Sequence, residues 1–335
     1  MSEQEHPFAQ YVRILGKGRH GSRALTPEES FEAMRLIMAD EVEPIQLGAF
    51  LMLMRVKEET GPEVAAFVRA IRESLQIPAD APKVDLDWSS YAGKKRQLPW
   101  YLLSALLLSQ NGVRIFMHGA SGHTAGRIYT KNILPEMGIP VAASLDEAAK
   151  QMAENNFAYL DLENLSPKLH QIIEMRPLLG LRSPVHTIAR ELNPFAADYV
   201  IQGIFHPGYR DIHLEAGKDL GEPHMAVIKG EGGEIERNPD IACLVRMLHN
   251  GEFSEEEWPP MFNKRHIRGD ELKIEDLLGV WRGEKEDEYG AASVAGTTAI
   301  ALYLMGRADN RESAEKMAWE MWNNRNGEEL LVASG

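Results

Sequence analysis

The stretch PWYLLSALLLSQNGVRIFMH, residues 99–118, decides the fold class of the chain. Pro99 is typical of the first turn of a helix, and the apolar run behind it continues as a helical segment up to Gly112. The next six residues, VRIFMH, form a short apolar run that predicts a strand. A helix that passes directly into a strand is typical of proteins built from alternating helices and strands.

The same alternation continues along the chain. Three more apolar runs predict strands, namely FAYLDL (157–162), DYVIQGIF (198–205) and HMAVIKG (224–230). Helical patterns lie between and behind them, over residues 144–155, 294–306 and 312–324. This order predicts an α/β fold, in which helices flank a sheet with at least some parallel pairing. EFSEEEWPP (252–260) is acidic and turn-rich, so we expect an exposed loop there.

The first 76 residues have a different character. They contain three or four amphipathic helices and no convincing strand. One helix start is clear, because Thr26-Pro27-Glu28-Glu29 combines an N-cap, a proline at the first helical position and a glutamate at the capping-box position. We therefore expect a small helical domain over residues 1–76 and a large α/β domain over residues 80–335.

Composition bounds the class of protein. With 44% hydrophobic residues in a chain of 335, it is an ordinary soluble globular protein. Fifty acidic residues against 36 basic ones give a formal charge of −14, so a site for a polyanion must be local. The single cysteine, Cys243, excludes an internal disulfide and a cysteine-based zinc site, and it is typical of a buried side chain in a reducing compartment. Without a visible signal peptide or membrane span, we expect a cytoplasmic protein with no membrane partner.

Positive charge is concentrated in one window. Residues 88–135 contain no Asp or Glu, although even spreading of 50 acidic residues over 335 would place about seven there. Within this window three basic residues stand together, directly before the helix that starts at Pro99: Lys94, Lys95 and Arg96. The helix dipole disfavours cations at this end of a helix, so we expect an anion to lie between them and the helix.

Neighbouring residues strengthen the expectation of an anion site. Backbone N–H groups at a helix start favour phosphate, and Ser90 and Tyr91 add hydroxyl donors beside Gly93. Tyr91 is also able to stack on a base. The alternative is that the basic run is a solvated loop, as most charge runs are.

The loop behind VRIFMH is a second candidate. Its glycines permit close approach of the backbone to a ligand, and Arg127 belongs to the same cleft if a helix begins between them. The candidate residues of this loop are His118, Gly119, Ser121 and Arg127. The alternative for His118 is a hydrogen-bonded, purely structural role at the end of the strand.

Several motifs resemble those of anthranilate phosphoribosyltransferase, over essentially the whole chain. They are TPEESFEAMRLIMADEVEPIQLGAFLMLMRVKEET (26–60), MHGASG (117–122), MRPLLGLRSPVH (175–186) and KGEGGEIERNP (229–239). Together with SYAGKKR (90–96), they are most similar to the YbiB-type branch of this family. The resemblance implies a homodimer with the nucleoside phosphorylase/phosphoribosyltransferase fold. In that fold a small helical domain, completed here by a segment near 165–185, lies on a large α/β domain with a central mixed sheet.

The resemblance also reveals departures from the enzymes. Their GTGGD loop wraps the pyrophosphate of phosphoribosyl pyrophosphate (PRPP) with bare backbone, whereas this chain reads SSYAGKK and keeps only Gly93. Their magnesium-binding Asp-Glu pair corresponds to GGEIER, which makes Glu234 and Glu236 the candidate metal ligands, with plain surface charge as the alternative. Arg176 corresponds to the anthranilate-binding arginine. The sequence requires no cofactor, and the only one that the resemblance suggests is Mg²⁺.

Two main functions follow from these patterns. The first is binding of nucleic acid, single-stranded DNA or RNA, through its backbone in a basic cleft, which is also what the resemblance to the YbiB-type branch implies. In this hypothesis Lys94, Lys95 and Arg96 neutralise phosphates, and Arg114 and Lys131 extend the track together with the Arg127 side chain. The alternative is transfer of phosphoribose from PRPP to an aromatic amine or base, helped by Mg²⁺. A third reading is a regulatory dimer that binds a phosphorylated metabolite. The missing loop glycines favour the first function.

Overall fold

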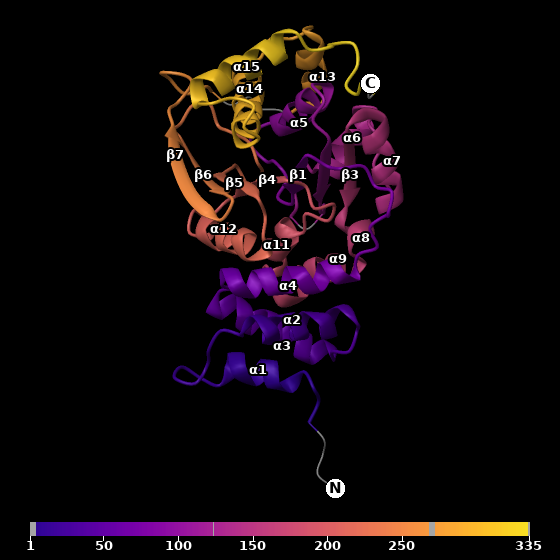
Figure 1. The fold of residues 1–335 in the computed structure, drawn as a ribbon, viewed down its shortest axis with the longest axis vertical. Helices are drawn as coiled ribbons and strands as arrows, with labels where there is room; N and C mark the ends of the chain where they lie inside the picture. The colour runs from indigo at the N-terminus through magenta and orange to yellow at the C-terminus, as the bar shows by residue number, and fades with distance from the viewer. Residues whose placement is uncertain (1–4, 123, 268–271, 334–335) are drawn as a thin grey trace.

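The computed structural model describes residues 5–122, 124–267 and 272–333. A layer of helices from the first quarter of the chain lies at one end of the molecule, and a sheet surrounded by helices forms the rest (Figure 1). The predicted architecture, a small helical part on a large α/β part, is therefore confirmed.

Four helices form the N-terminal layer. They are α1 (Ala9–Gly16), α2 (Pro27–Met38), α3 (Pro44–Lys57) and α4 (Gly61–Ser74). α2 begins with the expected capping box, in which Thr26 and Glu29 satisfy each other's backbone N–H groups, and α4 repeats this motif with Thr60 and Glu63. α4 packs against α2 on one side and against α12 (Tyr209–Leu220) on the other, so it joins the helical layer to the α/β part.

The sheet has seven strands in the order β3-β2-β1-β4-β5-β6-β7. Their bounds are β1 (Leu86–Ser90), β2 (Ile115–Gly119), β3 (Phe157–Asp161), β4 (Tyr199–Ile204), β5 (His224–Lys229), β6 (Cys243–His249) and β7 (Glu252–Trp258). Neighbouring strands from β3 to β5 pair in parallel, and β6 and β7 continue the sheet in antiparallel pairing. The expected mixed sheet is confirmed.

One predicted element is wrong. We expected an exposed loop over residues 252–260, but residues 252–258 form β7, which pairs with β6 along its whole length. β7 lies at the edge of the sheet, and its glutamates are mostly exposed. Charged side chains on an edge strand discourage pairing with another chain. The high charge of this segment therefore marks an edge strand.

Helices cover both faces of the sheet. On one face α5 (Trp100–Gln110) packs against α14 (Glu288–Leu304), and both are buried almost all around. The helix predicted from residue 99 onward is thus confirmed as α5. The other helices outside the connection between β3 and β4 are α6 (Thr130–Glu136), α7 (Leu145–Asn155), α13 (Glu275–Arg282) and α15 (Arg311–Asn323). No helix in the described ranges is both long and apolar enough to span a membrane.

Short helices connect β3 to β4 and lie next to the helical layer. They are α8 (Leu162–Leu165), α9 (Pro167–Glu174), α10 (Arg176–Leu179), α11 (Val185–Ile188) and the 3-10 helix η1 (Ala189–Glu191). α9 packs against α11, and α11 contacts α4, so this segment touches the N-terminal helices (Figure 1). The division into two domains near residues 76–80 stays a prediction.

A glycine sets the spacing between the ends of β1 and β2. A Cβ atom on Gly119 would lie 1.9 Å from the carbonyl oxygen of Ser90, a distance that no carbon atom tolerates. Since Ser90 and Gly119 are paired in the sheet, any side chain here would push the two strand ends apart. Gly119, one of the predicted ligand-binding residues, thus has a packing role at the edge where both loops leave the sheet.

Replacing this glycine tests the role of the close approach. Gly119→Ala should destabilise the protein by about 1–3 kcal/mol, because the strand ends have to shift to admit the methyl group. Gly208→Ala is the control, since Gly208 has helical φ and open space around it, and it should change stability by less than about 0.5 kcal/mol. Urea unfolding of both variants checks this. Equal stability of the two variants would contradict the packing role.

Candidate functional site

The carboxyl ends of the parallel strands meet at one edge of the sheet. Loop 91–99 follows β1, residues 120–122 and 124–129 follow β2, and the turn 230–236 follows β5. Ligands of open α/β sheets bind at this edge, outside the carboxyl ends of the strands. The candidate site therefore lies where these three segments come together.

Glu234 occupies the amide groups of the loop behind β1. Its Oε1 atom accepts hydrogen bonds from the backbone N–H groups of Ala92 and Gly93, at 2.6 and 2.5 Å. Gly93 has φ of 66°, which lets both N–H groups point the same way. The other oxygen, Oε2, is buried and has no hydrogen-bond partner among the described residues. An anion-binding loop therefore exists, and a carboxylate of the same chain lies in it.

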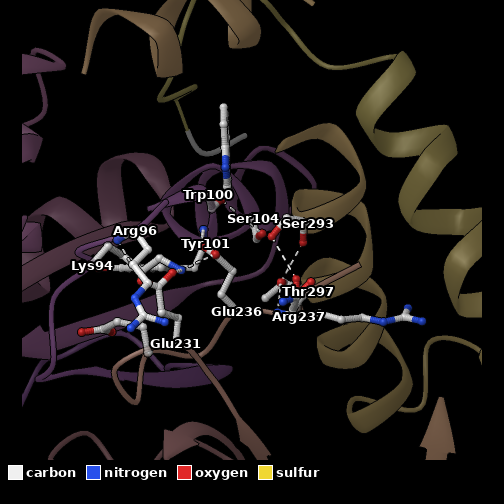
Figure 2. Close-up of polar contacts among 12 residues, drawn as sticks. Lys94, Arg96, Trp100, Tyr101, Ser104, Glu231, Glu236, Arg237, Ser293 and Thr297 are labelled. Atoms are coloured by element: carbon white, nitrogen blue, oxygen red, sulfur yellow. Dashed lines mark hydrogen bonds and ion pairs between the residues drawn. The ribbon is translucent and has the colours of Figure 1, made fainter. Parts of the chain in front are cut away.

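Lys94 is buried between two carboxylates. Its Nζ atom lies 2.5 Å from Glu236 Oε1 and 3.2 Å from Glu231 Oε2, and only 1% of its side chain is exposed (Figure 2). Burial by itself would lower the pKa of the Lys94 ammonium group, but the charges of Glu236 and Glu231 outweigh it and raise the pKa. Lys94 therefore stays charged, and its charge is neutralised inside the protein.

The turn that carries Glu236 is anchored to two helices. Glu236 Oε2 accepts the N–H group of Tyr101 at the start of α5, at 3.0 Å. The next residue, Arg237, donates its N–H to Thr297 and accepts a hydrogen bond from Ser293, both on α14, at 2.9 and 3.0 Å (Figure 2). These contacts fix the carboxylate of Glu236 relative to the sheet.

The other two basic residues of the run behave differently from Lys94. Lys95 and Arg96 are exposed, and the backbone N–H of Arg96 donates to Glu231 Oε1 at 2.8 Å. Arg96 lines a cavity of about 440 Å³, which is also lined by Lys94 and by the carboxylates of Glu231 and Glu236. This cavity has mixed charge, so it is not the purely basic cleft expected from the sequence.

His118 belongs to a buried chain of hydrogen bonds beneath the loops. Its Nδ1 lies 2.7 Å from the hydroxyl of Tyr91, and its Nε2 lies 3.2 Å from Asp87 Oδ1. His118 is fully buried, and Tyr91 and Asp87 are each 1% exposed. These side chains support the loop, and a ligand in the cavity beside Lys94 would not touch His118. Ser121 has a weak contact to Asp161 at 3.5 Å, and Ser90 binds Tyr101 and Thr130 below the loop.

A second, smaller cavity lies between the helical layer and the α/β part. Its volume is about 120 Å³, and its lining includes Arg55 of α3, Arg182, Ser183 and Arg190. Arg55 Nη1 donates to the hydroxyl of Tyr209 across the gap, at 2.8 Å. Ser183 Oγ and Arg190 Nε are buried and have no hydrogen-bond partner among the described residues. Buried polar atoms of this kind normally have a hydrogen-bond partner, which water or a polar ligand is able to supply in this cavity.

Four arginines lie near one another, namely Arg127, Arg176, Arg182 and Arg190, here called the arginine cluster. Two of them, Arg182 and Arg190, line this second cavity. Burial lowers the pKa of Arg182 to about 10, and the positive charges of Arg176, Arg127 and Arg190 add to this effect. In the described part of the chain, no carboxylate lies within ion-pair distance of Arg127, Arg182 or Arg190. Instead, Arg127 donates to the carbonyl oxygen of Ala92, and Arg182 to Thr124. The arginine cluster therefore favours an anionic ligand.

Only part of this cluster was expected from the sequence. Arg127 and Arg176 were expected to bind a ligand, whereas no role was expected for Arg182 and Arg190. A signal was present, because residues 175–190 contain three arginines and no acidic residue. The pattern had no obvious meaning, since these arginines come together with Arg127 only when the segment before β4 folds back over the loop behind β2.

Two residues of the expected basic track lie elsewhere or are already neutralised. Lys131 forms ion pairs with Asp161 and Glu163, at 3.4 and 3.0 Å. Arg114 stands before β2, at the opposite edge of the sheet, where it donates to the carbonyl oxygen of Lys83. The basic window of the sequence is thus divided in space and does not form one continuous patch.

The predicted metal pair is engaged by protein groups. Both oxygens of Glu236 and one oxygen of Glu234 have N–H or ammonium partners, which leaves only Glu234 Oε2. Within the described residues, no group of three His, Cys, Asp or Glu side chains is arranged to hold a metal ion. A divalent ion would have to displace Lys94 to reach Glu236.

Comparison with known proteins identifies relatives along almost the whole chain. Two domain models of a glycosyl transferase family match, the helical bundle domain over residues 10–75 and the α/β domain over residues 101–327. An uncharacterized protein of Aquifex aeolicus is 30% identical over 92% of this chain and 95% of its own length. The anthranilate phosphoribosyltransferase of Verminephrobacter eiseniae is 27% identical over 86% of each chain.

Solved structures share the fold. The anthranilate phosphoribosyltransferase of Thermus thermophilus superposes with a TM-score of 0.79 at 22% identity, over 97% of both chains. The Saccharomyces cerevisiae enzyme, in complex with PRPP and Mg, has a TM-score of 0.78 at 16% identity, over 97% of this chain and 95% of its own.

These findings overturn the expected nucleic-acid binding. Several relatives are named anthranilate phosphoribosyltransferases, and the yeast enzyme is in complex with PRPP and Mg, so the alternative function expected from the sequence, transfer of phosphoribose, fits them better. The physical reason for the error is that the consecutive basic residues 94–96 do not act together. Lys94 is neutralised by Glu236 and Glu231, so the run does not supply three charges to a phosphate backbone.

Breaking the buried ion pair of Lys94 should be costly. Lys94→Met leaves the carboxylate of Glu236 buried without its cation, so we expect a loss of about 3–5 kcal/mol in the free energy of unfolding, measured by urea denaturation. Lys83→Met removes an exposed ion pair with Asp198 and is the matched control, with no change in the midpoint expected. A Lys94→Met midpoint equal to that of the wild type would refute the internal role of the ion pair.

Proposed function

The chain belongs to the glycosyl transferase family and is an anthranilate phosphoribosyltransferase-like member of it, and on this premise we propose that it transfers a phosphorylated pentose from PRPP to a nitrogen nucleophile. The family match supports pentosyl transfer as the class of reaction. A cytoplasmic location, in which Cys243 stays reduced, is part of this proposal.

The arginine cluster is the observation that carries the proposal. Three of its members are buried or partly buried and lack a carboxylate partner among the described residues. A buried guanidinium group loses much of its hydration, which is offset when an anion with several oxygens binds it in a forked geometry. PRPP carries three phosphate groups, so it matches a site with several cations. The unpartnered Ser183 Oγ and Arg190 Nε atoms add donors at the same place.

The reaction depends more on stabilisation of the negative charge of the leaving group than on proton transfer. The bond between C1 of the ribose and the pyrophosphate oxygen breaks, and its electron pair leaves with pyrophosphate. The lone pair of the acceptor nitrogen forms the new bond to C1, and the nitrogen then releases a proton to solvent. The negative charge that grows on pyrophosphate is stabilised by cations fixed around it, which is the role we assign to Arg127, Arg182 and Arg190 of the arginine cluster.

The acceptor is proposed to bind on the side of the second cavity. That cavity offers Phe205 and His186 beside Arg182, and its volume of about 120 Å³ suits one small aromatic ring. Arg176, which donates to Thr124 at 2.6 Å, is the proposed partner for a carboxylate on the acceptor. The chemistry of the cavity thus supports an aromatic amine or base as acceptor.

Magnesium is present in the complex of the yeast relative with PRPP. We propose that any Mg²⁺ reaches this chain only as a companion of the pyrophosphate donor. The arrangement of Glu234 and Glu236 does not fit it directly, because the ammonium group of Lys94 is already bound to Glu236. No step of the proposed reaction is therefore assigned to a metal ion.

PRPP binding tests the proposed function. Isothermal titration calorimetry should detect binding of PRPP, and Arg182→Ala should weaken it at least about tenfold, or about 1.4 kcal/mol, because one charged contact is lost. Arg246→Ala is the control, since Arg246 on β6 pairs with Asp211 on α12 and with Glu255 on β7, and the affinity of this variant for PRPP should equal that of the wild type. No heat of binding, or an unchanged affinity in Arg182→Ala, would exclude this site for PRPP.

The helical layer carries an apolar stripe that we propose as a homodimer interface. On α3, Ile45 and Val56 are 83% and 82% exposed, and Ala49, Met52 and Leu53 lie between them on the same face. Positions separated by three or four residues share one face of a helix, so the stripe is continuous over the whole helix. An apolar stripe of this length is suited to pack against the same helix of a second copy.

Negative charge introduced into this apolar stripe should dissociate the homodimer. Ile45→Asp combined with Val56→Asp should convert the dimer to a monomer in analytical ultracentrifugation, because both carboxylates would be buried in the interface. Leu178→Asp is the control, since Leu178 is 87% exposed on α10, outside the stripe, and it should leave the dimer intact. A monomeric wild type would reject the interface.

A further inference from the structure

We propose that the ammonium group of Lys94 acts as a built-in cation between Glu231 and Glu236, in the place that a divalent metal ion would need. The protein would then bind its anionic ligand without a metal. The claim that Lys94 excludes a metal ion depends only on groups of the protein. The claim that the anionic ligand binds without a metal rests on the proposed function. In this role Lys94 is a positioning residue, which acts through the carboxylates that it neutralises.

The first observation is the geometry of three glutamates. Glu231, Glu234 and Glu236 all belong to the turn behind β5, and the last two are buried. Carboxylates so close together repel one another unless a cation or N–H donors lie among them. Glu234 is neutralised by the amides of Ala92 and Gly93, and Glu236 and Glu231 are neutralised by Lys94. Glu236 and Glu231 each also accept one backbone N–H group, and Lys94 is the cation that these two carboxylates share.

The second observation is that Lys94 is fixed at both ends. Its backbone forms a two-bond antiparallel bridge with Ile128, with both N–H to oxygen distances at 2.8 Å. Its ammonium group is held by Glu236, which is itself anchored to Tyr101 and, through Arg237, to α14 (Figure 2). Neither the lysine nor its carboxylate can move away without breaking several buried contacts. A metal ion therefore competes with a tethered cation whose local concentration it cannot match.

The third observation is the pair of carboxylate oxygens that Lys94 holds. If the ammonium group of Lys94 were absent, Glu236 Oε1 and Glu231 Oε2 would lose their cation. Carboxylate oxygens are the ligands that hard divalent ions prefer. Removal of the lysine charge should thus leave these two oxygens free to bind a hydrated divalent ion.

Uptake of Mn²⁺ by the protein alone provides the first test. Electron paramagnetic resonance of Mn²⁺ at a concentration about equal to that of the protein reports the free ion. We expect no uptake by the wild type or by Lys94→Arg, which keeps the positive charge. Lys94→Met should bind Mn²⁺ and show a higher melting temperature when Mn²⁺ is added, since an ion that binds only the folded state stabilises it. The double variant Lys94→Met with Glu236→Gln should lose both effects.

Each result decides the proposal. Uptake of Mn²⁺ by the wild type would overturn it, because the ammonium group would then not exclude the ion. Failure of folded Lys94→Met to bind would overturn it too, because the ion would be kept out by something else. Far-ultraviolet circular dichroism establishes that the variant is folded. Should Lys94→Met not fold, Lys94→Gln takes its place, with the same expected gain in Mn²⁺ binding.

Titration of PRPP with and without a metal is the second test. For the wild type, the affinity in EDTA should lie within twofold of the affinity in Mg²⁺, whereas Lys94→Met should bind at least tenfold more tightly with Mg²⁺. Wild-type binding that requires Mg²⁺ would overturn the role of Lys94 and leave the proposed function intact. Absence of PRPP binding under both conditions would remove the proposed function, while the Mn²⁺ experiment would still decide whether Lys94 excludes the metal.

Discussion

The contact between the loop behind β1 and the turn behind β5 determines the shape of the whole site. Glu234 accepts two amide hydrogen bonds from Ala92 and Gly93, and Lys94 pairs with Glu236, a residue 142 positions further along the chain. The two strands are not neighbours, since β4 lies between them. Because these groups are buried, each one would be left unpaired if its partner moved. The loop and the turn therefore hold each other in place, and the cavities on either side take their outline from this contact.

Charge is divided between two sides of this contact. On one side, Lys94 is enclosed by Glu231 and Glu236, so the cavity beside Arg96 has mixed charge. On the other side, Arg127, Arg182 and Arg190 of the arginine cluster form no ion pair with a carboxylate among the described residues, and Arg127 and Arg182 donate hydrogen bonds to a backbone carbonyl group and to Thr124. A chain with a net charge of −14 thus keeps a small region of strong positive potential. An anionic ligand is stabilised more strongly in that region than beside the exposed basic run.

The fate of residues 94–96 explains the error in the sequence-based function. A run of basic residues before a helix start indicates an anion, and an anion is indeed present. It is supplied by the protein itself, as the carboxylates of Glu231 and Glu236. The sequence pattern also did not predict the arginine cluster, because its members are spread from residue 127 to residue 190. Local sequence cannot tell an internal partner from a ligand, because both satisfy the same charge.

The sequence by itself determined the elements of this protein. Helical spacing and the capping box at Thr26, the apolar runs that became β2 to β5, and the short distance from α5 to β2 are local properties of the chain, and they required an α/β sheet with a helical layer. Tertiary structure alone decided which charges meet, because the partners of Lys94 and of Arg127 come from segments far away in sequence. The edge strand β7 shows the same limit, since only its pairing with β6 distinguishes an acidic strand from an acidic loop. Spacing along the chain encodes how each segment folds, and the free energy of a buried charge depends on what the rest of the fold brings beside it.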